Sequence, residues 1–195
     1  ELDLEFRNFL IKLIDLKNKI NPIPRPIAFK STIKKIFMSS DASGEALGFT
    51  MHIYSINSLG KAQCNLLCSR TKVHKSTIPI AEFQAVTKAC QELLSVFKMT
   101  PSYFSSLPDI IFSTDSSCTT FGLSPGKIHQ NVALKNNAYS VHSILTDLSN
   151  LIPGIVIKMV HLKSGNIAAD LVTRKHNDPV AICNSRLYRQ GPPLY

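Results

Sequence analysis

The chain has 195 residues, of which 44% are hydrophobic and 18% charged, and this composition suits one globular domain of ordinary size. Lys and Arg outnumber Asp and Glu by 22 to 13, and the resulting net charge of +9 favours a polyanionic partner. No apolar run approaches the ~20 residues that cross a bilayer, and from the charged start we expect no secretory signal.

The first part of the chain predicts a helix, a connector and three strands. Apolar residues recur at helical spacing over residues 1 to about 22. The segment Asn21-Pro-Ile-Pro-Arg-Pro26 then breaks any helix, so we expect an extended, Pro-rich connector. Strands are expected over residues 35–40, 47–56 and 63–70, and their closeness in sequence predicts an antiparallel meander.

The second part alternates helices with strands. Thr77 and Pro79 have the places of an N-cap and an early helical proline, so a helix is expected to begin there. The remaining expected elements, in chain order, are a strand over 110–114, a short helix, a longer helix over about 130–151, a strand over 155–160 and a short helix over 167–174. Residues 179–195 have little regular signal, and we expect an irregular tail.

Four acidic residues lie where these elements begin or end. Asp41 and Asp115 each follow an apolar strand, Glu82 lies on the apolar side of the helix that begins near Thr77, and Asp170 lies in the last helix. A central sheet with helices packed on it brings strand ends and helix starts to one edge, so we expect the four to converge.

Burying carboxylates is costly unless a cation or hydrogen-bond donors compensate. Any one of these acids alone is more simply a cap or a strand-end residue in water. The four together predict a divalent-metal site of the kind that cuts nucleic acid.

The motifs around the acids resemble those of a known family. They are Asp41-Ala-Ser43, Ile80-Ala-Glu82, Ser113-Thr-Asp115-Ser116 and Asn166-Ile-Ala-Ala-Asp170-Leu-Val-Thr-Arg174. With the order of elements, they resemble the ribonuclease H domains of LTR retrotransposon polyproteins. Four stretches resemble the BEL/Pao group in particular. They are Ile23–Arg25, Cys68–Val73, Thr77–Glu82 and Leu187-Tyr-Arg-Gln-Gly-Pro192. The resemblance covers essentially the whole chain, although the chain has no Trp and residues 118–136 match poorly.

The resemblance implies a ribonuclease H-like α/β fold, with a five-stranded mixed sheet flanked by helices. Residues 31–178 would form the ribonuclease H domain and 179–195 its irregular tail. Residues 1–30, the helix and the Pro-rich connector, would lead in from an upstream reverse transcriptase of the same polyprotein. Since residue 1 is not Met, we interpret the chain as a piece of a longer polypeptide.

The implied activity is endonucleolytic hydrolysis of the RNA strand of RNA–DNA hybrids during reverse transcription. Two Mg²⁺ or Mn²⁺ ions would be held by carboxylate oxygens, the ligands that such hard cations prefer. The resemblance assigns Asp41 to both ions, Glu82 and Asp115 to the leaving-group side and Asp170 to the water side. Glu82 is also a candidate contact for a 2′-hydroxyl.

Contacts to the hybrid are expected from three further sets of residues. Close backbone approach is expected at Ala42, Ser43 and Gly44, hydrogen bonding from Ser116 and Asn166, and phosphate binding from Ser69, Arg70 and Lys72. For each basic residue, a solvated surface charge is a nearly equal alternative. His161 is a candidate accessory residue in proton transfer, against the alternative of an ordinary strand-end histidine.

Three rival interpretations stay open. The first is a catalytically silent domain of the same fold that binds nucleic acid or acts as a spacer. The second is an integrase or transposase core, although such cores usually carry a late Glu where this chain has Asp170. The third is a basic nucleic-acid binder with no enzymatic role.

The five cysteines indicate reduced thiols, because their number is odd and no CxxC or paired-histidine spacing occurs. We therefore expect an intracellular, cytoplasmic protein without membrane association. For a retrotransposon domain, virus-like particles are the corresponding location.

Overall fold

The computed structural model describes residues 4–19, 31–99, 108–174 and 178–192. The expected Pro-rich connector lies outside the described residues. The five strands are β1 (Ser31–Ala42), β2 (Ala46–Asn57), β3 (Ala62–Val73), β4 (Asp109–Thr114) and β5 (Ile157–His161). The helices are α1 (Leu4–Lys19), α2 (Ile78–Met99), α3 (Ser117–Leu123), α4 (Val132–Leu151), α5 (Asp170–Thr173), α6 (Pro179–Asn184) and α7 (Arg186–Gln190), and a 3₁₀ turn, η2, spans Ser164–Asn166.

The strands form one mixed sheet in the order β3-β2-β1-β4-β5. The β1–β2 and β2–β3 pairs are antiparallel, as the meander prediction requires, whereas β4 pairs parallel with both β1 and β5. Parallel neighbours need a crossover, and α2 supplies it before β4 while α3 and α4 supply it before β5. The five-stranded mixed sheet predicted from the sequence is confirmed.

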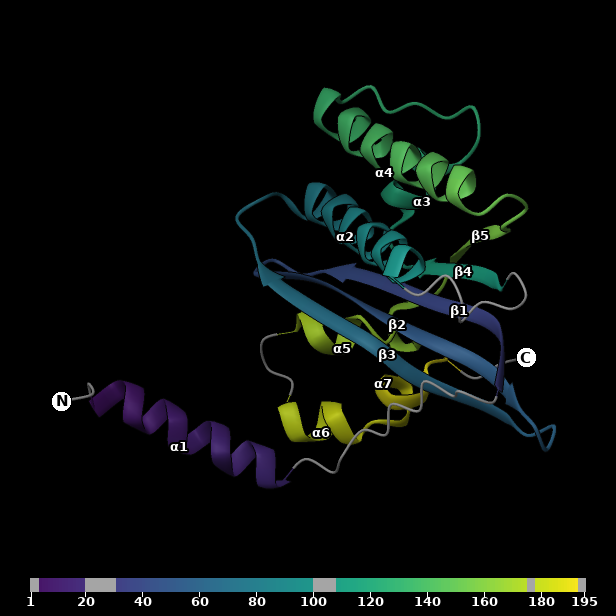
Figure 1. The fold of residues 1–195 in the computed structure, drawn as a ribbon. Coiled ribbons are helices and arrows are strands. Elements are labelled where there is room, and N and C mark those ends of the chain that lie inside the picture. The colour runs from purple at the N-terminus through teal and green to yellow at the C-terminus, as the bar shows by residue number, and fades with distance from the viewer. Residues whose placement is uncertain (1–3, 20–30, 100–107, 175–177, 193–195) are drawn as a thin grey trace.

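Helices cover both faces of the sheet (Figure 1). The helices α2, α3 and α4 lie on one face, and α5, α6 and α7 lie on the other. The main apolar core fills the space between the sheet and α2, where alternate strand residues such as Ile36 and Met38 meet Phe83 and Val86. The C-terminal helices pack beneath the antiparallel half, so both faces of β2 are covered.

The segment after residue 178 corrects the prediction of an irregular tail. It contains α6 and α7. Asp178 caps α6 by accepting a hydrogen bond from the backbone N–H of Val180, and Pro179 follows at the first helical position. Gly191 ends α7 in the left-handed region, with φ of 72°. Helices this short show no periodicity, so only their caps signal them.

The N-terminal helix α1 is amphipathic, and the structure confirms the helix that its apolar spacing predicts. In Figure 1 it lies beyond α6, with few contacts to the rest of the fold. Its apolar side chains, including Phe9 and Ile14, are largely exposed. Across the four described ranges, every helix is too short or too polar to span a bilayer.

Candidate metal centre

Three carboxylates meet at one edge of the sheet. Asp41 is the penultimate residue of β1, Asp115 follows β4, and Glu82 lies in the second turn of α2. Because β1 and β4 run parallel with Ser39 opposite Ser113, their acids leave the sheet at the same edge. One oxygen from each carboxylate lies within 4.8 Å of the other two. We call Asp41, Glu82 and Asp115 the acidic cluster.

Small side chains bring α2 close to the acidic cluster. Ala81 and Ala85 of α2 pack directly against Ala42 and Leu47 at the end of the β1–β2 hairpin. This close approach turns Glu82 inward, where it is only 6% exposed. An acid on the buried face of a helix is a local inconsistency of the kind that functional sites show.

Glu82 is short of hydrogen-bond partners. One carboxylate oxygen accepts a hydrogen bond from the backbone N–H of Ala42, but Oε2 is buried and has no partner among the described residues. Burial, followed by the charges of Asp41 and Asp115, raises the pKa of Glu82 to about 8. A cation or an additional donor at this position would therefore favour the ionised side chain.

Hydroxyl groups orient the other two members of the cluster. Thr173, at the end of α5, donates a hydrogen bond to Oδ2 of Asp41, and Ser164 of η2 donates one to Oδ2 of Asp115. Burial raises the pKa of Asp41, the Thr173 hydroxyl opposes that shift, and the charges of Asp115 and Asp170 add to it. Each carboxylate keeps a second oxygen that these hydroxyls do not occupy.

Asp170, the fourth predicted acid, lies outside the 4.8 Å cluster. Arg174, one helical turn later, binds its Oδ1 through Nε at 2.8 Å and through a second guanidinium nitrogen. Asp170 is nevertheless close enough for its charge to raise the pKa of Asp41. Both contacts from Arg174 go to the same oxygen, so among the described residues Arg174 leaves Oδ2 of Asp170 to a ligand.

The donor set fits a divalent metal ion. All three members of the acidic cluster offer carboxylate oxygens, the hard donors that Mg²⁺ and Mn²⁺ prefer over imidazole or thiolate. The unpartnered Oε2 of Glu82 marks a point where a cation would satisfy a buried group. In the part of the chain that the structure describes, no other group of three or more such side chains converges.

The loop after Asp41 holds three of the predicted hybrid contacts. Ala42 is buried, and its N–H is engaged by Glu82. The Ser43 hydroxyl donates to the carbonyl of Thr173 at 2.7 Å and accepts from the N–H of Ala46, so its role in this structure is to close the loop. Gly44 is exposed, and nothing lies within 4 Å of the position that a Cβ would take.

The other predicted contacts to the hybrid lie at the start of α3, on β3 and on η2. Ser116 is the N-cap of α3, next to Asp115. Arg70 is engaged in a two-point ion pair with Glu92, with both contacts at 3.0 Å. Ser69 is half-buried on β3, and Asn166 is exposed on η2.

His161 lies at the end of β5, the strand-end position that its sequence context favours. Its Nε2 contacts the backbone carbonyl of Asp115 at 3.0 Å. The ring is exposed and adjoins the acidic cluster through that carbonyl, which leaves its accessory role as a hypothesis.

Lys72 lines a cavity of about 530 Å³ that the sequence did not predict. Two further lysines from neighbouring segments, Lys75 and Lys88, share its lining, and we call it the lysine cavity. His74 also lines it and contacts the backbone carbonyl of Ser43 through Nε2 at 2.8 Å. That contact joins the cavity to the loop that follows Asp41.

The sequence also gave no sign of the residues that support the acids. Gly48 pairs with Asp41 across the β1–β2 ladder, and a Cβ there would lie 2.9 Å from the carbonyl of Arg70 and 3.2 Å from Cγ2 of Thr173. A glycine is therefore what lets α5 bring the Thr173 hydroxyl to Asp41. The motif Asn166–Arg174 contains Thr173, but no local pattern in it predicts the hydrogen bond to Asp41.

Several solved structures are similar to the chain at low sequence identity. The N-terminal ribonuclease H domain of a Mycobacterium tuberculosis protein is 10% identical over 69% of this chain and 86% of that chain, with a TM-score of 0.47. LC11-RNase H1 from compost, in complex with an RNA/DNA hybrid, is 16% identical over 66% and 83%, with a TM-score of 0.43. A foamy viral protease-reverse transcriptase is 12% identical over 84% of this chain but 25% of that chain, with a TM-score of 0.41.

No curated protein matches the chain significantly. A family model, described as the Pao retrotransposon-like RNaseH-like domain, matches residues 7–116, which is more than half of the chain. That range contains all three residues of the acidic cluster and ends before Asp170. The chain belongs to the family of Pao retrotransposon-like ribonuclease H-like domains.

Proposed function

We propose that this domain is an endoribonuclease that hydrolyses the RNA strand of RNA–DNA hybrids during reverse transcription. The observation that carries the proposal is the convergence of Asp41, Glu82 and Asp115 within 4.8 Å, where one buried oxygen of Glu82 has no partner among the described residues. Membership of a retrotransposon ribonuclease H-like family supports the same activity. All four expected acids are present, which argues against a silent domain, because loss of one acid is the simplest route to inactivity.

Two Mg²⁺ or Mn²⁺ ions, when bound, would activate the attacking water and stabilise the leaving 3′-oxygen of the RNA. In this proposal Asp41 would hold both ions, Glu82 and Asp115 would serve the leaving-group side, and Asp170 would serve the water side. The hydroxyls of Thr173 and Ser164 fix the carboxylates of Asp41 and Asp115, so the oxygens need not reorganise during the reaction.

The lysine cavity would bind phosphates of the hybrid. Lys72, Lys75 and Lys88 gather three positive charges beside the loop that follows Asp41. The exposed Gly44 would allow the duplex to approach the backbone closely. Ser116 directly follows Asp115 and is the N-cap of α3. In this arrangement contacts to 2′-hydroxyls, together with a fit to the groove geometry of a mixed duplex, would distinguish a hybrid from duplex DNA.

The proposal also assigns the parts of the chain. Residues 31–178 form the catalytic domain, and residues 1–30 lead in from an upstream reverse transcriptase. The apolar side chains of α1 are exposed, which supports the proposal that a neighbouring domain covers them. Beyond residue 178, α7 packs on β3 of this domain, and α6 packs on α7.

Cleavage of an end-labelled RNA–DNA hybrid with Mg²⁺ tests the proposal, with the wild type beside Asp115→Asn. Asp147→Asn is the matched control, because Asp147 is an exposed acid on α4 away from the acidic cluster. We expect metal-dependent cutting of the RNA strand by the wild type and the control, and a loss of at least roughly a hundredfold in Asp115→Asn. Hybrid binding without cutting, in the presence of either metal, would identify a silent domain and overturn the proposal.

A further inference from the structure

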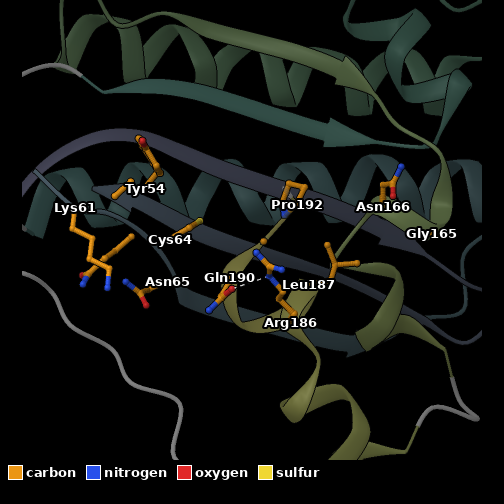
Figure 2. Close-up of a pocket in the computed structure, with 13 residues that line it drawn as sticks. Tyr54, Lys61, Cys64, Asn65, Gly165, Asn166, Arg186, Leu187, Gln190 and Pro192 are labelled. Carbon is orange, nitrogen blue, oxygen red and sulfur yellow. Dashed lines mark hydrogen bonds between the residues drawn. The ribbon is translucent and has the colours of Figure 1, made fainter. Parts of the chain in front are cut away.

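The structure has a second large cavity, on the sheet face opposite α2. It has a volume of about 850 Å³ and is bounded by the β2–β3 hairpin, by η2 and by α7 with the residues that follow it. Figure 2 shows Tyr54, Lys61 and Asn65 towards one end and Asn166 at the other, with the α7 side chains between them. We call it the α7 cavity. It shares no lining residue with the lysine cavity.

The wall formed by α7 is fixed to the sheet. His52 of β2 is buried, and its Nε2 contacts the backbone carbonyl of Tyr188 at 2.8 Å. Gly191 then turns the chain with φ of 72°, and a Cβ there would lie 3.1 Å from the His52 ring. Leu187, Gln190, Gly191 and Pro192 from the terminal motif line the cavity. A motif that the metal centre does not use therefore builds a pre-formed site.

The lining of the α7 cavity is cationic and rich in amides. Among the described residues, the lining contains Lys61 and Arg186 and no carboxylate side chain. Two amide side chains lie at the cavity beside these cations: Asn166 is exposed on η2, and Gln190 of α7 accepts a hydrogen bond from Nε of Arg186 at 3.1 Å. An amide donates and accepts hydrogen bonds at once, as the edges of unpaired bases require. Tyr54, half-buried in the lining, adds an aromatic ring on which a base can stack.

The turn η2 connects this cavity to the acidic cluster. Gly165 and Asn166 line the cavity, and Ser164 in the same turn donates its hydroxyl to Asp115. A strand that leaves the acidic cluster along η2 would therefore enter the α7 cavity at Asn166. The cations Lys61 and Arg186 disfavour an apolar ligand, and an acidic peptide does not need the continuity with the acidic cluster.

We infer that the α7 cavity binds single-stranded nucleic acid that is continuous with the duplex at the acidic cluster. Phosphates would contact Lys61 and Arg186, a base would stack on Tyr54, and base edges would pair with the amides. The inference extends the proposed function by adding a preference for hybrids with a single-stranded extension. RNA and DNA share this chemistry, and the position of the extension in the substrate distinguishes them.

The test measures binding of the full chain to labelled hybrids in EDTA by fluorescence anisotropy. A blunt hybrid is compared with hybrids that carry a single-stranded RNA or DNA extension on either side. We expect one kind of extension to tighten binding by about tenfold, the gain typical of one stacked base plus a phosphate contact. Tyr54→Ala and Arg186→Glu should each remove most of that gain, and Lys61→Glu provides a further charge reversal at an exposed position.

Lys158→Glu is the matched control, since Lys158 is exposed on β5 at the opposite edge of the sheet. Circular dichroism checks that each variant is folded. The inference is overturned when the gain from the extension survives in all three cavity variants or falls equally in Lys158→Glu. It is also overturned when a glutamate-rich peptide displaces the extended hybrid as well as a single-stranded oligonucleotide does.

Cleavage of the blunt hybrid with Mg²⁺ separates this inference from the proposed function. Arg186→Glu should cut the blunt hybrid at the wild-type rate, because Arg186 is not part of the acidic cluster. When the wild type fails to cut but the extension still tightens binding through Arg186, the proposed activity fails and the cavity assignment stands. When cutting occurs and the extension has no effect, the reverse holds.

Discussion

Glu82 has a strongly raised pKa within the acidic cluster. It is nearly buried and shares its surroundings with two other carboxylates. Burial and like charge both favour its protonated form, so its pKa rises to about 8. Binding a divalent cation reverses this preference, and metal binding near neutral pH should therefore release a proton.

The raised pKa of Glu82 predicts how the stability of the metal-free protein depends on pH. Between the unfolded pKa of about 4.5 and the folded pKa of about 8, the folded state binds more protons than the unfolded state at Glu82. The contribution to stability is therefore fully present at low pH and falls as the pH rises through this window, by an amount on the order of a few kcal/mol. The raised pKa of Asp41 adds to the fall in the same direction.

Urea unfolding in EDTA, at pH values of about 5 and about 8, measures the effect. Glu82→Gln should remove most of the fall because the amide does not titrate, whereas Asp147→Asn should keep it. Mg²⁺ should restore the stability of the wild type at the higher pH and have little effect on Glu82→Gln. A wild-type stability that rises with pH by more than that of Glu82→Gln would contradict the prediction.

Single residues also show how far the sequence leads. Asp41, Glu82 and Asp115 could be found because each acid ends an apolar strand or interrupts an apolar helix face, which are local patterns. The residues that orient them could not be found in this way. Thr173 reaches Asp41 across 132 residues and Ser164 reaches Asp115 across 49, and neither hydroxyl has a local pattern that marks it. Such contacts depend on the register of the sheet and on close approach at Gly48.

At the scale of elements, predictability follows length and periodicity. The strands and the long helices α2 and α4 were found because their apolar residues repeat over several turns or pleats. The helices α6 and α7 were missed because they have six and five residues, too few for a period. Their stability comes from caps and from contacts to β3 and His52, which a single sequence does not reveal.

Gly191 allows a prediction about how α7 is held. Gly191→Ala places a Cβ at φ of 72° and ψ of −173°, a conformation essentially restricted to glycine that costs about 1–3 kcal/mol, and also brings it to 3.1 Å from the His52 ring. We expect a destabilisation of roughly 2 kcal/mol, together with weaker packing of α7. Urea unfolding measures the total, and hydrogen exchange at the amide of Gly191, which bonds to the carbonyl of Leu187, reports on α7 itself.

Two other glycines separate the cost of the backbone conformation from the cost of the contact with His52. Gly60 has φ of 74° but open space around its missing Cβ, so Gly60→Ala should show the backbone cost alone. Gly44 has neither a left-handed backbone nor a neighbour within 4 Å, so Gly44→Ala should be nearly neutral. Equal losses in Gly191→Ala and Gly60→Ala would mean that the contact with His52 adds nothing.

At the scale of the whole molecule, the net charge of +9 becomes informative once its distribution is known. Three lysines converge on the lysine cavity, beside the acidic cluster. A cationic surround next to buried acids would attract phosphates while the acids hold metal. The composition predicted the polyanionic partner, but it could not predict which of the dispersed lysines would meet.

Salt dependence tests whether the position of these charges matters more than their number. Each phosphate that a lysine neutralises releases counterions, so the logarithm of hybrid affinity falls with the logarithm of salt concentration by about 0.7–0.9 per contact. Replacing Lys72, Lys75 and Lys88 together with Gln should therefore reduce that slope by about 2–3. Filter binding of a blunt hybrid in EDTA, over a series of salt concentrations, measures it.

A second triple variant has the same net charge and different positions. Lys34, Lys98 and Lys158 are exposed. Lys34 lies near the start of β1 and Lys98 near the end of α2, far along these elements from Asp41 and Glu82, and Lys158 lies on β5. Replacing these three with Gln also lowers the net charge by three, but it should leave the slope within about one unit of the wild type. Equal slopes in the two triples would mean that the hybrid is attracted by overall charge. A smaller slope only for Lys72, Lys75 and Lys88 would indicate that phosphates contact the lysine cavity, which would fix where the duplex lies relative to the acidic cluster.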